Sequence, residues 1–188
     1  MIINNSNFKI VVVNGRPESG KTTFEHLCQE HLTREFCKMR STVDEVKRIA
    51  FECGWDGKKT LKSRRFLSDL KDLLTNYNDL PFQDIKQFAI NFENDLIASN
   101  KEDFPHLLFV DAREPEGIQR LQNELGAVSL LIRRPDTEFG AVSNHADAEV
   151  FNYNYDYVII NDGSIEDLNN KAINFIELLF YDKAPWEV

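Results

Sequence analysis

The feature that most constrains the fold is an apolar run followed at once by a glycine-rich loop and a helical pattern. The run, Phe8-Lys9-Ile10-Val11-Val12-Val13, is rich in β-branched residues and predicts a buried strand. The loop reads Gly15-Arg16-Pro17-Glu18-Ser19-Gly20-Lys21-Thr22, which fits the pattern G-x-x-x-x-G-K-[ST], and a helix is expected from about Gly20 to Arg34. In this setting consecutive backbone N–H groups can surround phosphate oxygens, and the helix N-terminus favours anions. The segment therefore predicts a binding site for the phosphates of a nucleoside triphosphate.

Individual residues of the loop have separate expected roles. Gly15 and Gly20 permit backbone angles that are closed to other residues. Lys21 is expected to reach the β and γ phosphates, and Thr22 to offer its hydroxyl to Mg²⁺. The alternative is an ordinary glycine turn with a surface lysine. The full set expected to bind ATP is Gly15, Arg16, Pro17, Glu18, Ser19, Gly20, Lys21, Thr22 and Thr23.

The rest of the chain alternates strand and helix patterns, which indicates an α/β fold with a mainly parallel sheet. Further strands are expected at about 36–40, 106–110, 128–132 and 157–160, and helices at about 42–53, 60–77, 81–96, 114–125 and 164–180. Thr42-Val43-Asp44-Glu45 has the form of a capping box that would begin the first of these helices, and Ser164 is expected to cap the last. We expect one P-loop NTPase domain, a three-layer αβα sandwich with a five-stranded sheet. Its core would span 1–41 and 101–188, with a helical acceptor-binding insertion at about 42–100 and a short lid at about 135–152.

Charged residues follow two of the expected strands. Because ligands of open α/β sheets bind at the carboxyl ends of strands, Asp111 is expected to hold Mg²⁺ or to orient an acceptor oxygen. Arg113 could bind a phosphate through a bidentate contact of its guanidinium group. Arg133 and Arg134 could stabilise the charge that spreads over a transferring phosphoryl group. The alternatives are a solvated turn for Asp111, a surface ion pair for Arg113 and a solvated rim for the two arginines. Lys21, Asp111, Arg113 and Arg133 are the expected catalytic residues.

The net charge of −9 argues against a general nucleic-acid binder, which is normally basic. A local cluster of cations stands out in this acidic chain: Lys58, Lys59, Lys62, Arg64 and Arg65. Lys62 and Arg65 share a helix face beside Phe66 and Leu70, which should face the core, so these two cations are expected to bind an acceptor phosphate. Lys59 is assigned to solvent. The alternative is a solvated helix face.

Several classes of site are disfavoured by what the sequence lacks. No Cys or His spacing indicates zinc. Cys28, Cys37 and Cys53 are expected to be reduced thiols. No apolar run approaches the roughly 20 residues of a membrane span, and the first residues lack signal-peptide features. We therefore expect a cytoplasmic protein with no membrane or stable nucleic-acid partner, either a monomer or a homodimer.

Four parts of the chain resemble the P-loop nucleoside monophosphate kinase superfamily, above all phage-type deoxynucleoside monophosphate kinases. They are the glycine loop Gly15–Thr22, the strand ending Asp111-Ala112-Arg113, the pair Arg133-Arg134 before a short segment containing His145, and Tyr155-Asp156-Tyr157-Val158-Ile159-Ile160-Asn161-Asp162-Gly163. The resemblance spans most of the chain in order. Two regions depart from it: the lid of the family tends to read His-x-Ser-Glu where this chain has His145-Ala146-Asp147, and residues 42–100 match no acceptor signature.

The resemblance implies ATP and Mg²⁺ as cofactors, served by Lys21 and Thr22. It also implies that Asp111 and Arg113 face the acceptor and its phosphate, that Arg133 and His145 belong to the lid, and that the string from Tyr155 lies near the adenine. The residues expected to bind the metal are therefore Thr22 and Asp111. The residues expected to bind the acceptor are Lys62, Arg65, Arg113, Arg134 and His145.

The expected function is transfer of the ATP γ-phosphoryl group to a nucleoside monophosphate, with a deoxynucleotide favoured. Two alternatives stay open. One is a P-loop kinase for another small acceptor, such as dephospho-coenzyme A or a phosphorylated metabolite. The other is an ATP-binding sensor or assembly module that hydrolyses ATP slowly. A kinase needs cations on both the donor and the acceptor side, and this chain can supply both.

Overall fold

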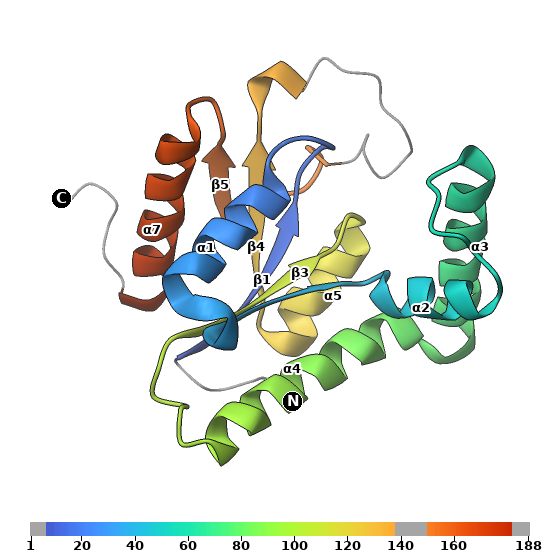
Figure 1. Cartoon of the computed structure of the whole chain (residues 1–188), viewed down its shortest axis with the longest axis horizontal. Helices are drawn as coiled ribbons and strands as arrows, with labels where there is room; N and C mark the ends of the chain where they lie inside the picture. The colour runs from blue at the N-terminus through green and yellow to red at the C-terminus, as the bar shows by residue number, and fades with distance from the viewer. Residues whose placement is uncertain (1–6, 138–149, 182–188) are drawn as a thin grey trace.

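The computed structural model describes residues 7–137 and 150–181, and its centre is a five-stranded sheet in which every pair of neighbours is parallel (Figure 1). The strand order is β2-β3-β1-β4-β5. The strands are β1 (Phe8–Asn14), β2 (Cys37–Ser41), β3 (His106–Asp111), β4 (Val128–Arg133) and β5 (Tyr157–Ile160). The predicted α/β fold with a parallel sheet is confirmed, and each predicted strand is present.

The strand register brings several chain segments to one edge of the sheet. Asp111, the last residue of β3, pairs with Val13 of β1 on one side and with Ser41 of β2 on the other. On the far side of β1, Asn14 pairs with Leu131 of β4. Because all strands are parallel, the loops that leave β1, β2, β3 and β4 gather at this edge.

Two helices cover each face of the sheet, which completes the predicted three layers. Helices α1 (Lys21–Phe36) and α7 (Ile165–Tyr181) lie on one face, and α4 (Leu80–Ala98) and α5 (Pro115–Leu125) lie on the other (Figure 1). Alternate residues of β1 point to opposite faces, as a strand requires. One side contributes Val11 and Val13, and the other Ile10 and Val12.

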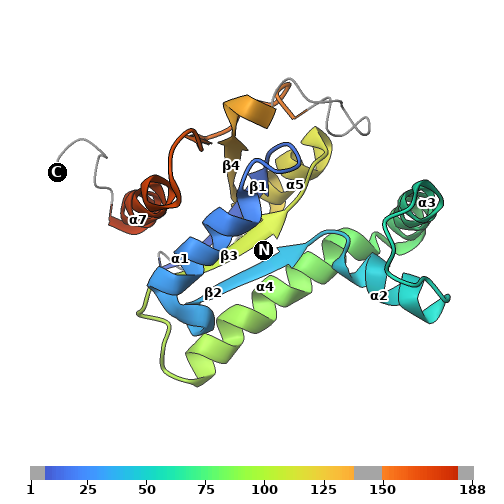
Figure 2. The ribbon, with the colours of Figure 1, turned by 45° about the horizontal axis from the view of Figure 1, so that its top comes forward.

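Helices α2 (Asp44–Glu52) and α3 (Leu61–Asn78) lie beyond the end of β2 (Figure 2). Although α2 buries two apolar residues, α3 buries none of its own. The prediction that Phe66 and Leu70 face the core is therefore wrong: Phe66 is 37% exposed and Leu70 is half-buried. The physical reason is that α3 packs along α2 and α4, away from the sheet, so its apolar stripe is covered only in part.

The predicted capping box at Thr42 is also wrong. Helix α2 begins at Asp44, whose Oδ2 accepts a hydrogen bond of 2.7 Å from the Ser41 backbone N–H. Thr42 instead binds the end of β3, since both its backbone N–H (3.2 Å) and its hydroxyl (3.3 Å) donate to the Asp111 carbonyl. At the last helix the prediction is confirmed, because the Asp167 N–H donates to the Ser164 hydroxyl at 3.2 Å.

Cys28, Cys37 and Cys53 are free thiols, and the first two are buried. Across residues 7–137 and 150–181, none of the helices is both long enough and apolar enough to pass through a bilayer.

Candidate active site

The glycine loop between β1 and α1 adopts a conformation that depends on its two glycines. Gly15 has φ 152° and Gly20 has φ 96°, both in a region that favours glycine. A Cβ atom built on Gly15 would lie 2.4 Å from the carbonyl oxygen of Ile132, and one on Gly20 would lie 2.4 Å from Nδ2 of Asn161. Any side chain at either position would therefore displace neighbouring atoms, as the sequence pattern predicted.

Hydrogen bonds fix the loop at both ends. The Gly15 N–H donates to Oδ1 of Asn14 at 2.8 Å, and the Ser19 N–H donates to the Arg16 carbonyl at 3.2 Å. The Asn161 side-chain amide donates to the Ser19 carbonyl at 3.0 Å. The Ser19 hydroxyl is buried and has no hydrogen-bond partner among the described residues. A fixed loop with an unsatisfied hydroxyl suits a ligand rich in oxygen atoms.

Lys21 opens α1 and lies over the loop. Its ammonium group donates to the carbonyls of Gly15 at 2.6 Å and Arg16 at 3.1 Å. Within the described chain Gly20 caps the helix without a side-chain hydrogen bond, and the first turn carries no acidic residue. The unsatisfied N–H groups at this helix start, together with Lys21, form an anion site. Thr22 and Thr23 are exposed beside it.

Two carboxyl groups, those of Asp111 and Glu25, lie near Lys21, and the sequence analysis did not predict that Glu25 would belong to this group. Glu25 is in α1 and only 2% exposed, and Asp111 ends β3. Burial and the nearby Asp111 raise the pKa of Glu25 to about 8, against the opposing effect of Lys21. Burial also raises the pKa of Asp111, which Lys21 and Arg113 partly lower. The signal for Glu25 in the sequence was an acid four residues after Lys21, next to the core residue Phe24.

A further cation near Asp111, Lys47, was not predicted. Lys47, in α2, helps to lower the pKa of Asp111, as Arg113 does, while Asp44 raises it. Lys47 also lies 3.5 Å from Asp44, one turn earlier in the helix. Arg113 is exposed just after β3. Arg113 and Lys47 thus approach Asp111 from the loop after β3 and from α2.

The cations predicted at the start of α3 point elsewhere. The Arg65 side chain is 86% exposed, and its ion pair is with Asp69 of the same helix at 3.8 Å. Lys62 is exposed as well. A later residue of α3, Lys71, is the one that contacts the loop after β3, where it pairs with Glu114 at 2.8 Å. The contact between α3 and the loop after β3 is therefore made by Lys71, and the exposed Lys62 and Arg65 have no described contact with that loop.

Beside the glycine loop, Arg16 and Arg133 lie over the same aromatic ring. Their guanidinium carbons are 5.1 Å and 5.3 Å from the centroid of Phe151, distances at which cations and aromatic rings attract. Arg133 ends β4, and its carbonyl accepts a hydrogen bond from the Asn161 N–H at 2.6 Å. Phe151 thus brings Arg133 of β4 close to Arg16 of the glycine loop. Phe151 was not predicted, since a single aromatic residue in an irregular segment gives no periodic signal.

Most of the predicted lid falls outside the described residues. The segment 138–149, which includes His145, is not among them. Arg134 is exposed, and Pro135–Thr137 form a short 3₁₀ helix, η1.

The donor set of this edge fits Mg²⁺ that arrives with a nucleotide. Among the described residues, no group of three or more His, Cys, Asp and Glu side chains could hold a metal ion by itself. Mg²⁺ in kinase sites takes only one or two carboxylates and fills its shell with phosphate oxygens and water. The Thr22 hydroxyl and the Asp111 carboxylate are hard oxygen donors of this kind.

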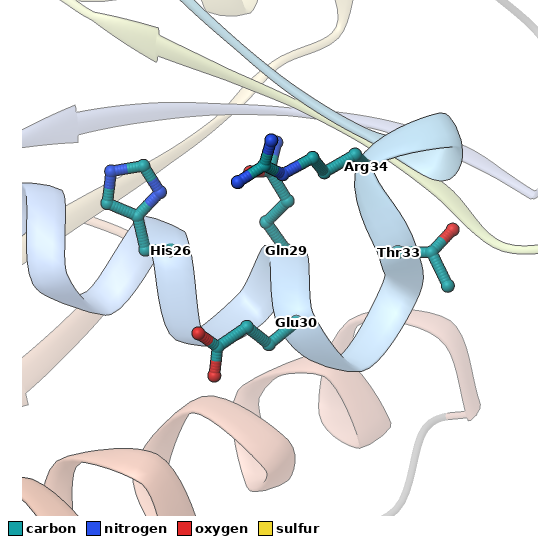
Figure 3. A pocket seen from close by; sticks show the side chains of 5 residues that line it. All are labelled: His26, Gln29, Glu30, Thr33 and Arg34. Atoms are coloured by element: carbon teal, nitrogen blue, oxygen red, sulfur yellow. The ribbon is translucent and has the colours of Figure 1, made fainter.

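A pocket along α1 is separate from this edge. It is lined by His26, Gln29, Glu30, Thr33 and Arg34 (Figure 3). These residues follow one another toward the C-terminal end of α1, whereas the glycine loop adjoins its N-terminal end. The pocket contains none of the predicted site residues.

Known proteins resemble this chain in structure, but no family model and no curated protein sequence matches it. A shikimate kinase from Aquifex aeolicus is 12% identical, with TM-score 0.48, and the match covers 93% of this chain and 99% of that one. An APS kinase from Mycobacterium tuberculosis in complex with AMPPNP and APS is 15% identical, with TM-score 0.44, covering 91% and 98%. A thymidylate kinase from Ehrlichia chaffeensis is 15% identical, with TM-score 0.40, covering 90% and 99%. Each TM-score is below 0.5, so these likenesses do not bear on the acceptor of this chain.

Proposed function

We propose that this chain is an ATP-dependent phosphotransferase that transfers the γ-phosphoryl group to a nucleoside monophosphate, with deoxynucleotides favoured. The observation that carries the proposal is the convergence of two cationic groups at one sheet edge. Lys21 and the loop N–H groups supply the first, and Arg113 and Lys47 supply the second, with Asp111 between them. One anionic ligand needs only one such group, whereas a donor and an acceptor that both carry phosphate need two.

On the donor side, the loop and Lys21 would hold the ATP phosphates. The loop is already fixed by Asn14 and Asn161, so its N–H groups need little reorganisation when phosphate binds. Lys21 would exchange its hydrogen bonds to loop carbonyls for bonds to phosphate oxygens. Mg²⁺, held by Thr22 and Asp111, would neutralise charge that develops on the phosphates.

On the acceptor side, Arg113 and Lys47 would hold the phosphate of the monophosphate in line with the donor. Since phosphoryl transfer needs mainly positioning and charge neutralisation, these cations and Asp111 would be sufficient to orient the attacking oxygen. Exposed Arg65 and Lys62 fit this task less well than Lys47. Arg133 would add a cation beside the transferring group, while Arg134 and His145 remain candidates for contacts from the lid.

Two alternative functions differ from this one in what they require of Arg113 and Lys47. A kinase for dephospho-coenzyme A or a phosphorylated metabolite would use the same donor side with a different acceptor. An ATP-binding sensor would not need Arg113 and Lys47 opposite the glycine loop. The proposed enzyme is cytoplasmic and acts on small molecules, with no nucleic-acid partner.

A screen for ADP release tests the proposal. Purified protein is incubated with ATP, Mg²⁺ and each ribo- and deoxynucleoside monophosphate, with dephospho-coenzyme A and sugar phosphates as alternative acceptors. We expect acceptor-dependent ADP release with at least one monophosphate, and its loss in Lys21→Ala. Release only with a non-nucleotide acceptor would overturn the proposed substrate class, and ADP release independent of every acceptor would support the sensor.

A further inference from the structure

Glu25 is a buried acid that has no role in the proposed phosphoryl transfer. It lies four residues after Lys21 in α1, so the two side chains are neighbours on the same face of the helix. It is 2% exposed and is preceded by Phe24, which is fully buried in the core. Its Oε1 atom has no hydrogen-bond partner among residues 7–137 and 150–181. A buried carboxyl oxygen without a partner is costly, so its retention calls for an explanation.

The groups around Glu25 show what kind of ligand would satisfy it. Asp111 and Lys21 are the charged groups that act on it. On its other side are two thiols, Cys28 and Cys37, and the pKa of each is raised mainly by burial and further by Glu25. Two thiols held in the protonated form are poor metal ligands. The two carboxyl groups, of Glu25 and Asp111, offer oxygen atoms, and Thr22, three residues before Glu25 in α1, carries a hydroxyl.

Lys21 cannot offset both acids when a nucleotide is bound. In the proposed function its ammonium group moves onto phosphate oxygens, and Arg113 turns to the acceptor phosphate. Glu25 and Asp111 would then face additional negative charge without their nearest cations. A divalent cation at this position would restore the balance, and hard oxygen donors select Mg²⁺ or Mn²⁺ over softer metals.

We propose that Glu25 is a further metal-binding residue, which acts with Asp111 and the Thr22 hydroxyl to bind the divalent cation that accompanies the nucleotide, directly or through one metal-bound water. This inference rests on the proposed function, because it takes the nucleotide to be the ligand of the glycine loop. The proposed metal-binding residues are then Thr22, Asp111 and Glu25, of which Glu25 lies within α1. The competing interpretation is that Glu25 is a protonated structural residue of the helix.

Binding of Mn²⁺, followed by electron paramagnetic resonance in protein saturated with ADP, tests the proposal. Glu25→Gln keeps the size of the side chain and removes the charge. We expect it to weaken Mn²⁺ binding by about 10-fold or more, as loss of a group that supports a metal does, and Asp111→Asn to do the same. Glu30→Gln, on the exposed side of the same helix, is the matched control and should bind Mn²⁺ like the wild type.

The outcomes separate this inference from the function on which it rests. Mn²⁺ affinity in Glu25→Gln equal to that in Glu30→Gln would overturn the role of Glu25, even if phosphotransfer is observed. Failure of the wild type to bind ADP would overturn the proposed function, and Mn²⁺ titration without nucleotide would still compare the two variants. Circular dichroism checks the fold. Glu25→Leu, which removes the carboxyl group and suits the apolar surroundings, provides the comparison if Glu25→Gln does not fold, and unchanged Mn²⁺ affinity in that variant would equally contradict the proposal.

Discussion

The side-chain amide of Asn14 donates a hydrogen bond of 2.8 Å to the hydroxyl of Tyr155. The same amide also donates to the Arg113 carbonyl at 3.1 Å, while Oδ1 of Asn14 accepts from the Gly15 N–H. The Tyr155 hydroxyl in turn donates to the Val150 carbonyl at 2.9 Å. One buried asparagine at the end of β1 thus connects the glycine loop, the loop after β3 and the segment that precedes β5.

Replacement of Tyr155 by Phe tests this connection. The ring packing is kept, but the Asn14 amide and the Val150 carbonyl each lose a partner. We expect the free energy of unfolding to fall by about 1–3 kcal/mol, the usual result of leaving buried polar groups unsatisfied, as measured by urea denaturation. Tyr157→Phe is the control, because the structure assigns the Tyr157 hydroxyl no hydrogen bond within its described part, and it should change stability by less than about 0.5 kcal/mol. Equal effects of the two substitutions would contradict the role of the Tyr155 hydroxyl.

The parts of the fold that the sequence predicted are those set by local pattern. Gly15 and Gly20 are required by backbone angles and by contacts within a strand–loop–helix unit, so the motif was sufficient to locate them. The strand ending at Asp111 was evident from its apolar run. Ser164 caps α7 through a bond to a residue only three positions later, so its role was also readable from the sequence.

The parts that were missed depend on tertiary contacts. Phe66 belongs to a helical apolar stripe, but periodicity does not reveal whether a neighbour covers that stripe, and α3 receives only partial cover. Thr42 has the pattern of a cap, yet it binds the Asp111 carbonyl 69 positions away. Glu25 and Lys47 both act on Asp111, although they belong to α1 and α2, far from Asp111 along the chain. Their proximity to Asp111 could not be derived from spacing along the chain.

Lys21 is the residue whose replacement tests the donor side. Lys21→Ala should lower kcat by about 10²-fold or more, since loss of one preorganised donor to developing charge has this effect. The substitution should leave the circular dichroism spectrum unchanged, because the lysine contacts loop carbonyls and contributes little to the core. Lys59→Ala serves as the control for loss of a lysine. A folded Lys21→Ala variant with the kcat of the wild type would rule out the glycine loop as the donor site.

Asp111→Asn tests the acid at the end of β3. The change keeps the shape and removes the charge, so the apparent affinity for Mg²⁺ should fall and more Mg²⁺ should be needed for half-maximal activity. ATP affinity should fall less, because the loop and Lys21 are intact. Full activity at limiting Mg²⁺ would show that Asp111 has only a structural role.

The acceptor side is tested by comparing cations near to and far from Asp111. Arg113→Ala and Lys47→Ala should each raise the KM of the acceptor and lower kcat/KM by the equivalent of about 1.5–3 kcal/mol, with little change in the KM of ATP. Arg65→Ala and Lys59→Ala should have small effects, because neither side chain is among the charges that act on Asp111. A larger effect on kcat/KM of Arg65→Ala than of Lys47→Ala would indicate that the acceptor binds at the start of α3.

His106 makes the stability of the fold depend on pH, independently of the active site. The histidine is fully buried at the start of β3, stacked on Phe8 with ring centroids 5.0 Å apart. Nδ1 lies 2.6 Å from the Phe104 carbonyl, while Nε2 has no hydrogen-bond partner in the described part of the chain. Burial lowers the pKa of His106, and the bond to Phe104 opposes this only in part.

The consequence is that the contribution of His106 to stability is lost in mild acid. Below an ordinary histidine pKa of about 6.5 the unfolded chain binds a proton at this position, whereas the folded chain does not until the pH reaches the lower folded value. The unfolded state therefore binds more protons in that window, and the free energy of unfolding falls as the pH falls, by at most about 1.4 kcal/mol per pH unit for this group. Urea denaturation at pH 7 and pH 5.5 should show a smaller decline for His106→Phe than for the wild type, whatever the absolute stability of the variant. His26→Asn, which removes an exposed histidine, should keep the wild-type decline, and an identical decline in His106→Phe would exclude His106 as its source.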